Sequence, residues 1–385
     1  MAGSWLDSTD PEVVQRWEVE LEREVRVKGP LFDPANGFTG KGFNKLIKLE
    51  DSLSTGPGAT VTSTMRYQLS GRGRVGNEPM KGHGEAIKTA TFKTGVDVFR
   101  HYVEVSSPMY DQYVQFTALE EGRDGLADLM ATRFELAANL HATGFSIITD
   151  KAYTLNNTVN ALASNYILRP NAKASAQALT SSDIFDLDFL NQLALRVKLL
   201  QPQIRPISTP DGEVYAVFLA SEQVASLRKS DSIWFQTAQN ALKGGFLEKN
   251  PLFTNALGMS QGYVFFEERY VPPGINTSDS KIQDNTRRGW IGGAQALVLA
   301  FGRGDAPAGY ALNKFRWDRE TEDFGHVGQI AATTVVGMNR QRFSKPGTGV
   351  YQEAGVLAFE TYAEHGLDAA TVYAPWTEAG ASIHA

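Results

Sequence analysis

Apolar and polar residues alternate along residues 60–70, where Met65, Tyr67 and Leu69 are separated by polar side chains. A period of two in a segment rich in Thr and Val predicts a half-buried β-strand. The residues that follow cannot hold a helix and predict a loop tip; they include Gly71, Gly73, Gly76, Pro79, Gly82 and Gly84. Apolar residues return along a second arm at residues 85–105, so the whole segment predicts a long, glycine-tipped β-hairpin.

The predicted hairpin has no obvious cover of its own. A two-stranded hairpin is marginally stable alone in water and needs a surface to lie on. No segment adjacent in the sequence has a pattern suited to covering it, so we expect a neighbouring subunit to do so. The hairpin is also basic, because Glu78 and Glu85 are outnumbered by Arg66, Arg72, Arg74, Lys81, Lys88 and Lys93.

A very long helix is predicted directly after the hairpin. Ser106-Ser107-Pro108 is a helix start signal, and Gly144 offers the stop. Apolar residues recur between them at spacings of three and four, at Tyr113, Phe116, Leu119, Leu126, Met130, Phe134, Ala137 and Leu140. About thirty residues would span roughly 45 Å. Gly122 and Gly125 lie inside this pattern, so we expect either a bend or the close packing of another backbone there.

The rest of the chain mixes helices and strands in blocks, which is typical of an α+β protein. A helix at residues 10–25 carries Trp17 on its apolar stripe and either docks on its own core or grips a neighbour. Residues 156–182 predict a loop, and a second helix at 185–200 stops at Pro202. A helix capped by Ser221 follows a β-hairpin that turns at residues 210–212. Strands are expected at 263–271, 317–322, 330–337 and 349–362, and residues 294–301 suit either a strand or a buried helix.

Composition excludes several classes of protein. The chain has 385 residues, a formal net charge of −6 and no cysteine, so disulfides and thiolate metal sites are excluded. Residues 1–10 lack the basic start and apolar core of a signal peptide. No apolar run reaches the length needed to span a membrane. The net charge argues against general coating of nucleic acid, which needs a basic surface.

Two motifs resemble enzyme signatures but lie in the wrong context. Residues 71–76 match G-x-G-x-x-G, yet no helix opens after the last glycine, as a dinucleotide site requires. Residues 258–262 match G-x-S-x-G around Ser260, but a loop is expected before the serine and a strand after it, the reverse of a nucleophile elbow. We therefore expect a loop tip and a turn, with no catalytic residue and no cofactor.

Three acidic residues, Asp318, Glu320 and Glu322, would share one face of a strand. The pattern fits a solvated face, or pairing with Arg316 or with a basic loop of another subunit, better than a metal site. The six histidines show no compact ligand spacing. His141 falls near the end of the long helix, where a positive charge would favour the helix dipole.

In combination, these segments resemble the tailed-phage major capsid proteins of the N4 gp56 type, which carry the HK97-like fold. The resemblance rests on the following stretches: T-V-T-S-T-M-R-Y-Q-L-S-G-R-G-R-V-G-N-E at 60–78, F-R-H-Y-V-E-V at 99–105, the long helix, N-P-L-F-T-N-A-L-G-M-S-Q-G-Y-V at 250–264, G-G-A-Q-A-L-V-L-A-F-G at 292–302, and the closing segment 324–362. Their order and spacing make it specific. The implied fold is α+β, with an N-terminal arm, an extended β-hairpin loop, a long spine helix, and peripheral and axial domains.

The resemblance also implies a division of the chain into segments. The N-terminal arm and connector would occupy residues 1–57, the extended loop 58–105, and the peripheral domain with the spine helix 106–185. The axial domain would occupy residues 186–310, and the chain would return to the peripheral domain at 311–385. Contacts between subunits are then expected at Trp17, Arg66, Arg72, Arg74, Lys81, Lys88, Asp318, Glu320 and Glu322.

The function implied is structural, without enzymatic activity. Such proteins form hexamers and pentamers that close an icosahedral shell around double-stranded DNA, which they do not bind sequence-specifically. The resemblance implies a virion protein, assembled in the host cytoplasm without a membrane. Further partners would be a portal protein, a decoration protein and, because the arm before the core is short, a separate scaffolding protein. Two alternatives stay open, an encapsulin-like compartment for a protein cargo and, from another class, a hydrolase using Ser260.

Overall fold

The computed structural model describes residues 31–32, 36–53, 58–67, 69, 71–106, 118–209, 212–230, 256–302, 314–322, 327–345 and 349–384. The predicted N-terminal helix with Trp17 and the predicted helix start at Ser107 and Pro108 lie outside these residues. Among the described helices, none combines the length and the apolar character needed to cross a membrane. The described chain mixes two large sheets with a few helices, as the α+β prediction requires.

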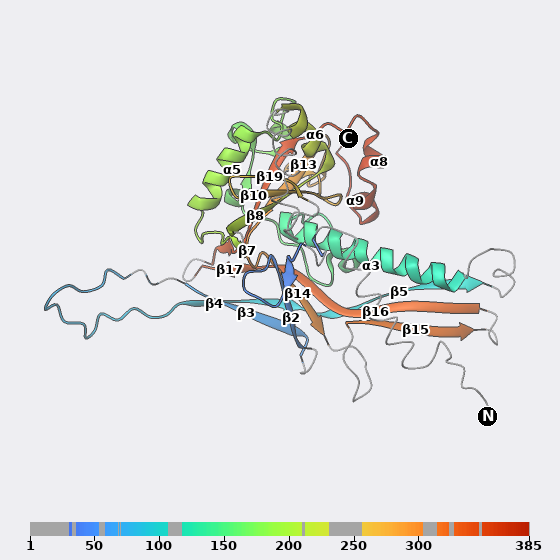
Figure 1. Ribbon diagram of the computed structural model, residues 1–385, viewed down its shortest axis with the longest axis horizontal. Coiled ribbons are helices and arrows are strands. Elements are labelled where there is room, and N and C mark those ends of the chain that lie inside the picture. The colour runs from blue at the N-terminus through green and yellow to red at the C-terminus, as the bar shows by residue number, and fades with distance from the viewer. Residues whose placement is uncertain are drawn as a thin grey trace.

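A six-stranded sheet forms the elongated lower part of the molecule in Figure 1. Its strands are β1 (Thr39–Gly40), β2 (Ile47–Leu53), β14 (Leu297–Gly302), β16 (Val327–Arg340), β15 (Phe315–Glu322) and β5 (Asp97–Ser106). The long strand β16 organises this sheet. It pairs antiparallel with β5 and β15 over its first part and with β14 over its last residues, while β2 pairs parallel with β14.

The long helix α3 (Ala118–Thr143) lies along this sheet (Figure 1). The part of the predicted stripe whose side chains are described is buried, including Leu126, Met130 and Phe134, and packs against β-strand residues such as Phe301 and Ile330. The helix runs without interruption through both glycines. A methyl group at Gly122 would stand 3.3 Å from Val103 Cγ1, so a side chain of β5, and not another backbone, packs closely on this glycine.

A seven-stranded sheet forms the compact upper part (Figure 1). Its strands are β6 (Ile167–Leu168), β19 (Val356–Tyr362), β13 (Thr286–Gly292), β8 (Gly212–Leu219), β10 (Tyr263–Glu267), β9 (Ala256–Ser260) and β7 (Ile207–Thr209). The predicted second helix is α5 (Leu187–Leu199), whose N-cap Asp186 accepts a hydrogen bond from Phe189 N at 2.8 Å. It buries Phe189 and Leu193 against this sheet.

Smaller elements complete the described chain. Short helices are α4 (Lys151–Thr154), η1 (Ser164–Tyr166), η2 (Pro170–Ala172), η3 (Ala176–Ala178), α6 (Ser221–Ser230), α8 (Ala369–Val372) and α9 (Ala374–Glu378). Three two-stranded ribbons pair β3 (Thr60–Arg66) with β4 (Thr89–Gly95), β11 (Gly274–Ile275) with β12 (Ile282–Gln283), and β17 (Arg342–Ser344) with β18 (Tyr351–Glu353). Residues 156–182 therefore hold only single turns and one two-residue strand, close to the predicted loop.

Two local predictions were wrong. The return arm predicted at 85–105 is two strands, because the chain leaves the hairpin at Val96 and β5 pairs with β16 instead. Alternation alone cannot tell which partner a strand takes. Ser221 does not cap α6, since it is the first helical residue. Instead, the Gln223 side chain accepts a hydrogen bond from Ala220 N at 3.0 Å.

The two sheets draw on strands from distant parts of the sequence. Strand β14 belongs to the six-stranded sheet, although it falls within the segment 186–310 that we expected to be axial. Strand β19 belongs to the seven-stranded sheet, although it falls within the segment 311–385. Each sheet is therefore completed by a strand from the other segment, and the chain crosses between the two layers several times.

Candidate assembly surfaces

The β-hairpin projects from the body as a finger, a name used here for β3, β4 and residues 67–88 between them. The two strands pair in register from Thr60 opposite Gly95 to Arg66 opposite Thr89. In Figure 1 the finger extends well away from both sheets. Its tip turns through Gly73, Gly76 and Gly82, whose positive φ angles of 75°, 63° and 84° suit glycine.

The root of the finger is covered by its own chain, contrary to part of our expectation. Ala90 and Phe92 of β4 pack on Phe343 of β17, and Met65 and Tyr67 join the same cluster. The Tyr67 hydroxyl donates a hydrogen bond to the Ser344 carbonyl at 3.2 Å. The strand that covers the root, β17, lies about 250 residues later in the chain. The pattern of the segments adjacent to the hairpin therefore did not indicate it.

The tip has no comparable cover among the described residues. Four large apolar side chains are exposed there, Leu69 at 59%, Val75 at 75%, Met80 at 79% and Ile87 at 66%. The alternation predicted Leu69 to be half buried like Met65 and Tyr67, but within its own chain Leu69 is exposed. An exposed apolar group of this kind marks an interaction surface more often than a solvated loop.

The charges of the finger are partly used within it. Arg72 and Arg74 both pair with Glu78, at 3.4 Å and 3.2 Å, and Glu85 Oε2 accepts a hydrogen bond from Gly71 N at 2.6 Å. Such exposed ion pairs contribute at most about 1 kcal/mol, so a neighbour's carboxylate could replace Glu78. The other predicted contact residues of the finger, Arg66, Lys81 and Lys88, are exposed.

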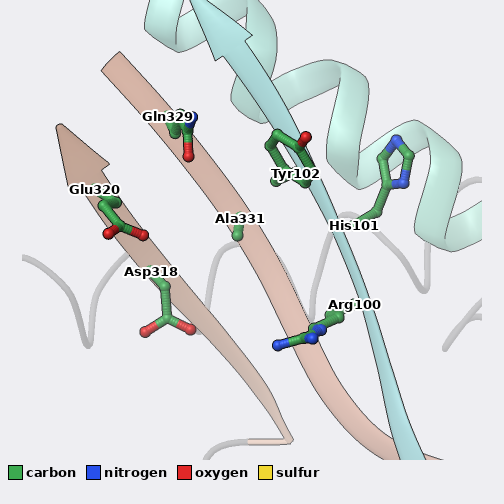
Figure 2. A pocket seen from close by; sticks show the side chains of 7 residues that line it. All are labelled: Arg100, His101, Tyr102, Asp318, Glu320, Gln329 and Ala331. Carbon is green, nitrogen blue, oxygen red and sulfur yellow. The ribbon is translucent and has the colours of Figure 1, made fainter. Parts of the chain in front are cut away.

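A hollow lies on the face of the six-stranded sheet turned away from α3 (Figure 2). Tyr102 of β5 and Asp318 of β15 are both in register with Ala331 of β16, which lies between them. The small Ala331 side chain leaves a space of about 440 Å³ that is also lined by Arg100 and Glu320. Because alternate residues of a strand share a face, Asp318 and Glu320 point the same way, as predicted.

The acidic stripe is partly paired within the chain. Asp318 Oδ1 lies 2.7 Å from Arg316 Nη2, which is one of the pairings expected from the sequence. Glu320 is exposed at the rim of the hollow. Glu322 ends β15, but its side chain lies outside the described part of the structure. Among the described residues, no three acidic or histidine side chains are placed to hold a metal ion.

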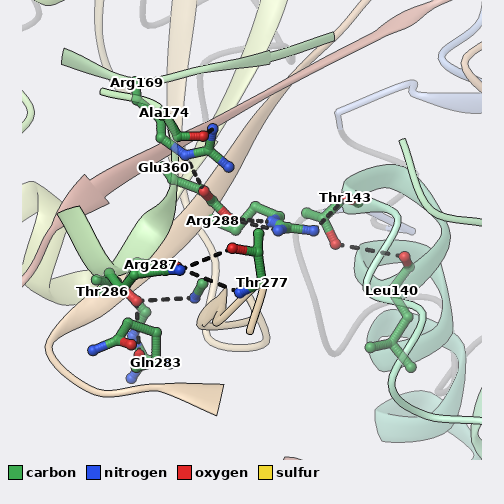
Figure 3. A network of polar contacts seen from close by, with 12 residues as sticks. Leu140, Thr143, Arg169, Ala174, Thr277, Gln283, Thr286, Arg287, Arg288 and Glu360 are labelled. Atoms are coloured by element: carbon green, nitrogen blue, oxygen red, sulfur yellow. Dashed lines mark hydrogen bonds and ion pairs between the residues drawn. The ribbon is translucent and has the colours of Figure 1, made fainter. Parts of the chain in front are cut away.

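The C-terminal end of α3 is held by a buried polar group that joins both sheets, here called the helix-end junction. It consists of Thr143, Arg288, Arg340, Glu353 and Glu360 (Figure 3 shows the part around Arg288 and Glu360). Arg340 of β16 donates to the His141 carbonyl at 2.6 Å, and Arg288 of β13 donates to the Thr143 carbonyl at 3.4 Å. The two guanidiniums also complement the negative end of the helix dipole.

Each arginine of the junction has a buried carboxylate. Arg340 Nε and Nη2 lie 2.7 Å and 3.0 Å from the two oxygens of Glu353. Glu360 accepts from Arg288 Nε at 2.7 Å and from Arg169 Nε at 2.6 Å. Burial acts to raise the pKa of Glu360, but the two guanidiniums outweigh it and hold this pKa below its ordinary value. The junction therefore fixes the spine helix to both sheets.

His141 does not supply a charge to the helix dipole, so that prediction was wrong. Its side chain is fully buried, and burial lowers its pKa to about 4. Its Nε2 donates a hydrogen bond to the Thr154 carbonyl at 2.9 Å. The neutral imidazole thus ties α3 to α4, and Arg288 and Arg340 take the electrostatic role at the helix end.

The two enzyme-like motifs are structural. Residues 71–76 lie in the finger tip, as predicted. Ser260 ends β9, and Gln261 and Gly262 turn the chain into β10 with φ angles of 53° and 84°. A strand therefore precedes the serine where we expected a loop, but a strand and not a helix follows it. This is a β-hairpin turn, with no nucleophile elbow.

Several residues of these surfaces were not anticipated from the sequence. Arg100 and Tyr102 share the hollow with the acidic stripe, and Tyr102 is 58% exposed. The alternation along residues 97–106 placed Arg100 and Tyr102 on one face of a strand. The sequence around them did not indicate that β16 would pair with both β5 and β15 and so bring this face next to the acidic residues. The junction arginines were missed because a buried arginine resembles a surface one in sequence.

Comparisons with known proteins agree with this arrangement. A family model described as phage capsid protein matches residues 9–365. No curated protein matches the sequence. The chain is similar in structure to the capsid protein of Ralstonia phage GP4, with a TM-score of 0.74, 21% identity, and 95% of this chain and 100% of that chain covered.

Two further solved structures are similar. For the capsid of cyanophage Pam1 the TM-score is 0.64 at 14% identity, covering 94% of this chain and 96% of that one. For the head of Helicobacter pylori bacteriophage KHP40 the TM-score is 0.58 at 17% identity, covering 87% and 92%. These likenesses confirm the expected α+β capsid fold.

Proposed function

The chain belongs to the phage capsid protein family, and from that premise we propose that it is the major capsid protein of a tailed phage of the N4 gp56 type. Its copies would form hexamers and pentamers that close an icosahedral head around double-stranded DNA. The observation that carries the proposal beyond the family match is the finger, whose tip exposes four large apolar side chains. Burying them on another copy would offset the unfavourable hydration of the free tip.

The neighbour's surface proposed for the finger is the acidic side of the hollow at Asp318 and Glu320. The finger carries Arg66, Arg72, Arg74, Lys81 and Lys88, so its charge is complementary to that stripe. Tyr102 adds an exposed ring to the same hollow, over which a cationic side chain could stack. Complementary charge would set the register of the contact more than its strength.

A shell needs only modest affinity at each contact. Every subunit would give one finger and receive one, so many weak contacts act together and stabilise the closed particle. The helix-end junction supports this role, because a finger can position a neighbour only if the body from which it projects is rigid. In this proposal the finger, residues 60–95, acts as the extended loop, β5 belongs to the body, and α3 is the spine of the peripheral domain.

The other parts of the proposal follow from the family. The head would be assembled in the host cytoplasm with a portal protein and a separate scaffolding protein, and a decoration protein could bind outside. DNA would fill the shell without sequence-specific contacts. The family match supports this over an encapsulin-like compartment, and the hairpin turn at Ser260 gives no support to a hydrolase.

The experiment is to express the chain and examine the purified product by electron microscopy. Closed shells of uniform size are expected, either from the chain alone or with the scaffolding protein of its phage. Particles purified from infected cells should contain double-stranded DNA and one portal vertex. Particles filled with a protein cargo would instead support the encapsulin-like hypothesis. A monodisperse monomer, both alone and with the scaffolding protein, would contradict the capsid and the encapsulin-like hypotheses alike.

The absence of cysteine from the sequence allows a direct test of the finger contact. Cysteines would be introduced in place of Lys81 at the tip and Glu320 at the hollow, in separate chains that are then mixed and assembled. A disulfide between the two chains is expected on oxidation. As a matched control, Lys81→Cys mixed with Lys151→Cys should give no such product; equal yields from both mixtures would contradict the proposed contact.

A further inference from the structure

A second hollow, separate from the assembly surfaces, lies between α3 and the chain just after β10, and is called here the α3–β10 hollow. Its volume is about 740 Å³. One wall is a single face of α3, because Asp128, Thr132 and Glu135 are four and three residues apart. The other wall holds Glu267 and Glu268. The hollow therefore separates the spine helix from the body of the seven-stranded sheet.

Two carboxyl groups are buried at this hollow with incomplete hydrogen bonding. Glu135 is 6% exposed and Glu268 is 1% exposed. Glu268 Oε1 accepts a hydrogen bond from Tyr270 N at 3.2 Å, and Arg269 N and the Asn139 side chain also hydrogen-bond the Glu268 carboxyl group. Among the described residues, Glu268 Oε2 and Glu135 Oε1 have no hydrogen-bond partner. Buried polar atoms in native proteins are nearly always paired, so two orphaned oxygens beside one hollow point to a bound group.

The electrostatics of the pair specify the sign of that group. Burial, reinforced by the charge of Glu268, raises the pKa of Glu135, and burial raises the pKa of Glu268. Within the described part of the chain, neither carboxyl group is paired with a buried cation, in contrast to Glu353 and Glu360 at the helix-end junction. Two buried carboxyl groups without a cationic partner provide a site for a cation.

The other charged groups around the hollow leave it acidic. Asp128 lies on α3, and Glu267 accepts a hydrogen bond from the Ser221 hydroxyl at 2.6 Å. The basic residue of the lining is Arg269, whose guanidinium lies 5.8 Å from the Tyr270 ring centre. Among the described residues of the lining, Glu135, Glu267 and Glu268 against the guanidinium of Arg269 favour a cation over an anion or an apolar ligand.

We propose that the α3–β10 hollow binds one divalent cation of the oxygen-preferring class, Ca²⁺ or Mg²⁺, with Glu135 and Glu268 as its charged ligands. Such ions accept carboxylates, hydroxyls and water together, and Mg²⁺ commonly takes only one or two protein carboxylates. Binding would link α3 to the seven-stranded sheet through the ion and would displace a proton from the two carboxyl groups.

The test is calorimetric titration of CaCl₂, and separately of MgCl₂, into the purified full-length chain after treatment with EDTA. One site per chain is expected for at least one of the two ions. Binding should release protons, seen as a heat that changes with the ionisation enthalpy of the buffer. Affinity should fall about tenfold per pH unit as the pH decreases below the pKa of the displaced proton.

Variants make the assignment specific. Glu135→Gln and Glu268→Gln keep the side-chain shape and remove a repulsion, so each should fold in EDTA and melt no lower than the parent. Each should lose at least about tenfold in affinity for the ion, because one charged ligand is gone. As a matched control, the acidic pair on the other sheet, replaced as Asp318→Asn with Glu320→Gln, should bind the ion like the parent.

The proposal would be overturned by either of two results. One is the absence of saturable binding of both ions, which would leave a proton as the occupant of the hollow. The other is binding that survives in the Glu135→Gln and Glu268→Gln double variant. The measurement needs no shell, so its outcome is independent of the proposed function.

Discussion

At the residue scale, a few side chains determine how the spine helix ends. Gly144 follows α3 with a φ angle of 65°, and Phe145 N donates to the Leu140 carbonyl at 3.1 Å while Gly144 N donates to the His141 carbonyl at 3.3 Å. This is a Schellman motif, which favours glycine at the left-handed position. Leu140 and Phe145 also lie in one buried cluster.

Replacing Gly144 with Ala should therefore destabilise the chain. The left-handed conformation alone costs about 1–2 kcal/mol for alanine, and the new methyl group would lie 2.8 Å from Leu162 N. We expect a loss of at least that size in the free energy of unfolding, measured by urea denaturation. Gly125→Ala is the matched control, because its methyl group meets no atom within 4 Å. This control should stabilise the helix by up to about 1 kcal/mol, and equal effects of the two changes would contradict the account.

The buried His141 predicts sensitivity to acid. Its pKa falls from an ordinary value of 6.5 to about 4 on folding, so the unfolded chain binds a proton that the folded chain rejects. Stability is thus fully present above pH 6.5 and declines as the pH falls towards 4, by about 1.4 kcal/mol per pH unit at most.

His141→Gln should remove that part of the decline, measured as the difference in unfolding free energy between pH 7 and pH 5. Glu135 and Glu268 respond to pH with the opposite sign, since their pKa values are raised on folding. Their contribution is the same in both proteins and cancels in the comparison. His83→Gln, in the exposed finger, is the control and should keep the parent's pH dependence. An unchanged decline in His141→Gln would refute the explanation.

At the element scale, the finger has two different ends. Its root is part of the folded body through Phe92, Phe343 and Tyr67, whereas its tip carries the exposed apolar residues. Because the contacts of the root are local to β4 and β17, the tip contributes little to the stability of the subunit. The two functions of the element, anchoring and reaching, are thus separated along its length.

Shortening the finger should separate folding from assembly. Replacing residues 70–85 with Asn-Gly would close β3 and β4 with a two-residue turn suited to a hairpin. We expect a melting temperature within a few degrees of the parent, because the root contacts are kept, and no shells in size-exclusion chromatography. Closed shells from this variant would show that the tip is not needed.

Local pattern predicted most elements but not their partners. The spacing of Leu126, Met130 and Phe134 was enough to place the spine helix, and the Thr-rich alternation placed β3. The pattern did not predict which strands pair, because β16 pairs with β5, which lies more than 200 residues away in the sequence. The sequence near Val96 gave no sign that one predicted arm would divide between a hairpin and a sheet.

The candidate surfaces were predictable only in part, for the same reason. The charges of Asp318 and Glu320 and their shared face followed from the strand period, but the hollow depends on Ala331 and Tyr102 from two other strands. Glu135 lay within an otherwise apolar helix pattern, which was a usable signal. No signal in the sequence indicated that its neighbour Glu268 is buried, because a glutamate directly after an apolar strand is usually at the surface.

At the scale of the whole molecule, two sheets are held at a fixed relation by one helix. Strand β16 delivers Arg340 and strand β13 delivers Arg288 to the same helix end. Removing one partner of a buried ion pair leaves an uncompensated charge. The junction therefore makes the body rigid, and the finger projects from this rigid body. Such rigidity suits a subunit that packs against identical copies.

The junction should accordingly be sensitive to neutralisation. Glu360→Gln would leave Arg288 and Arg169 facing each other without a carboxylate, and we expect a loss of about 3–5 kcal/mol in unfolding free energy. Glu213→Gln, at an exposed position at the start of β8, is a matched control that should change stability by less than about 0.5 kcal/mol. Similar losses in the two variants, measured by urea denaturation, would argue against the junction.

Charge exchange tests the contact between molecules. Arg72→Glu with Arg74→Glu should block shell closure and leave the subunit folded, because both side chains are on the exposed tip. The conservative pair Arg72→Lys with Arg74→Lys should still assemble. Adding Asp318→Arg and Glu320→Arg to the charge-reversed chain should restore shells at least in part, as counted by electron microscopy. Normal particles from the charge-reversed chain alone would disprove the proposed contact.

The most direct measurement is a cryo-electron microscopy reconstruction of the assembled particle at a resolution that traces the finger. We predict that the tip at Val75 and Met80 lies on a different copy of the chain, against the sheet face that carries Tyr102, Asp318 and Glu320. A tip that folds back on its own subunit, or that stands free in solvent within a closed shell, would contradict this account.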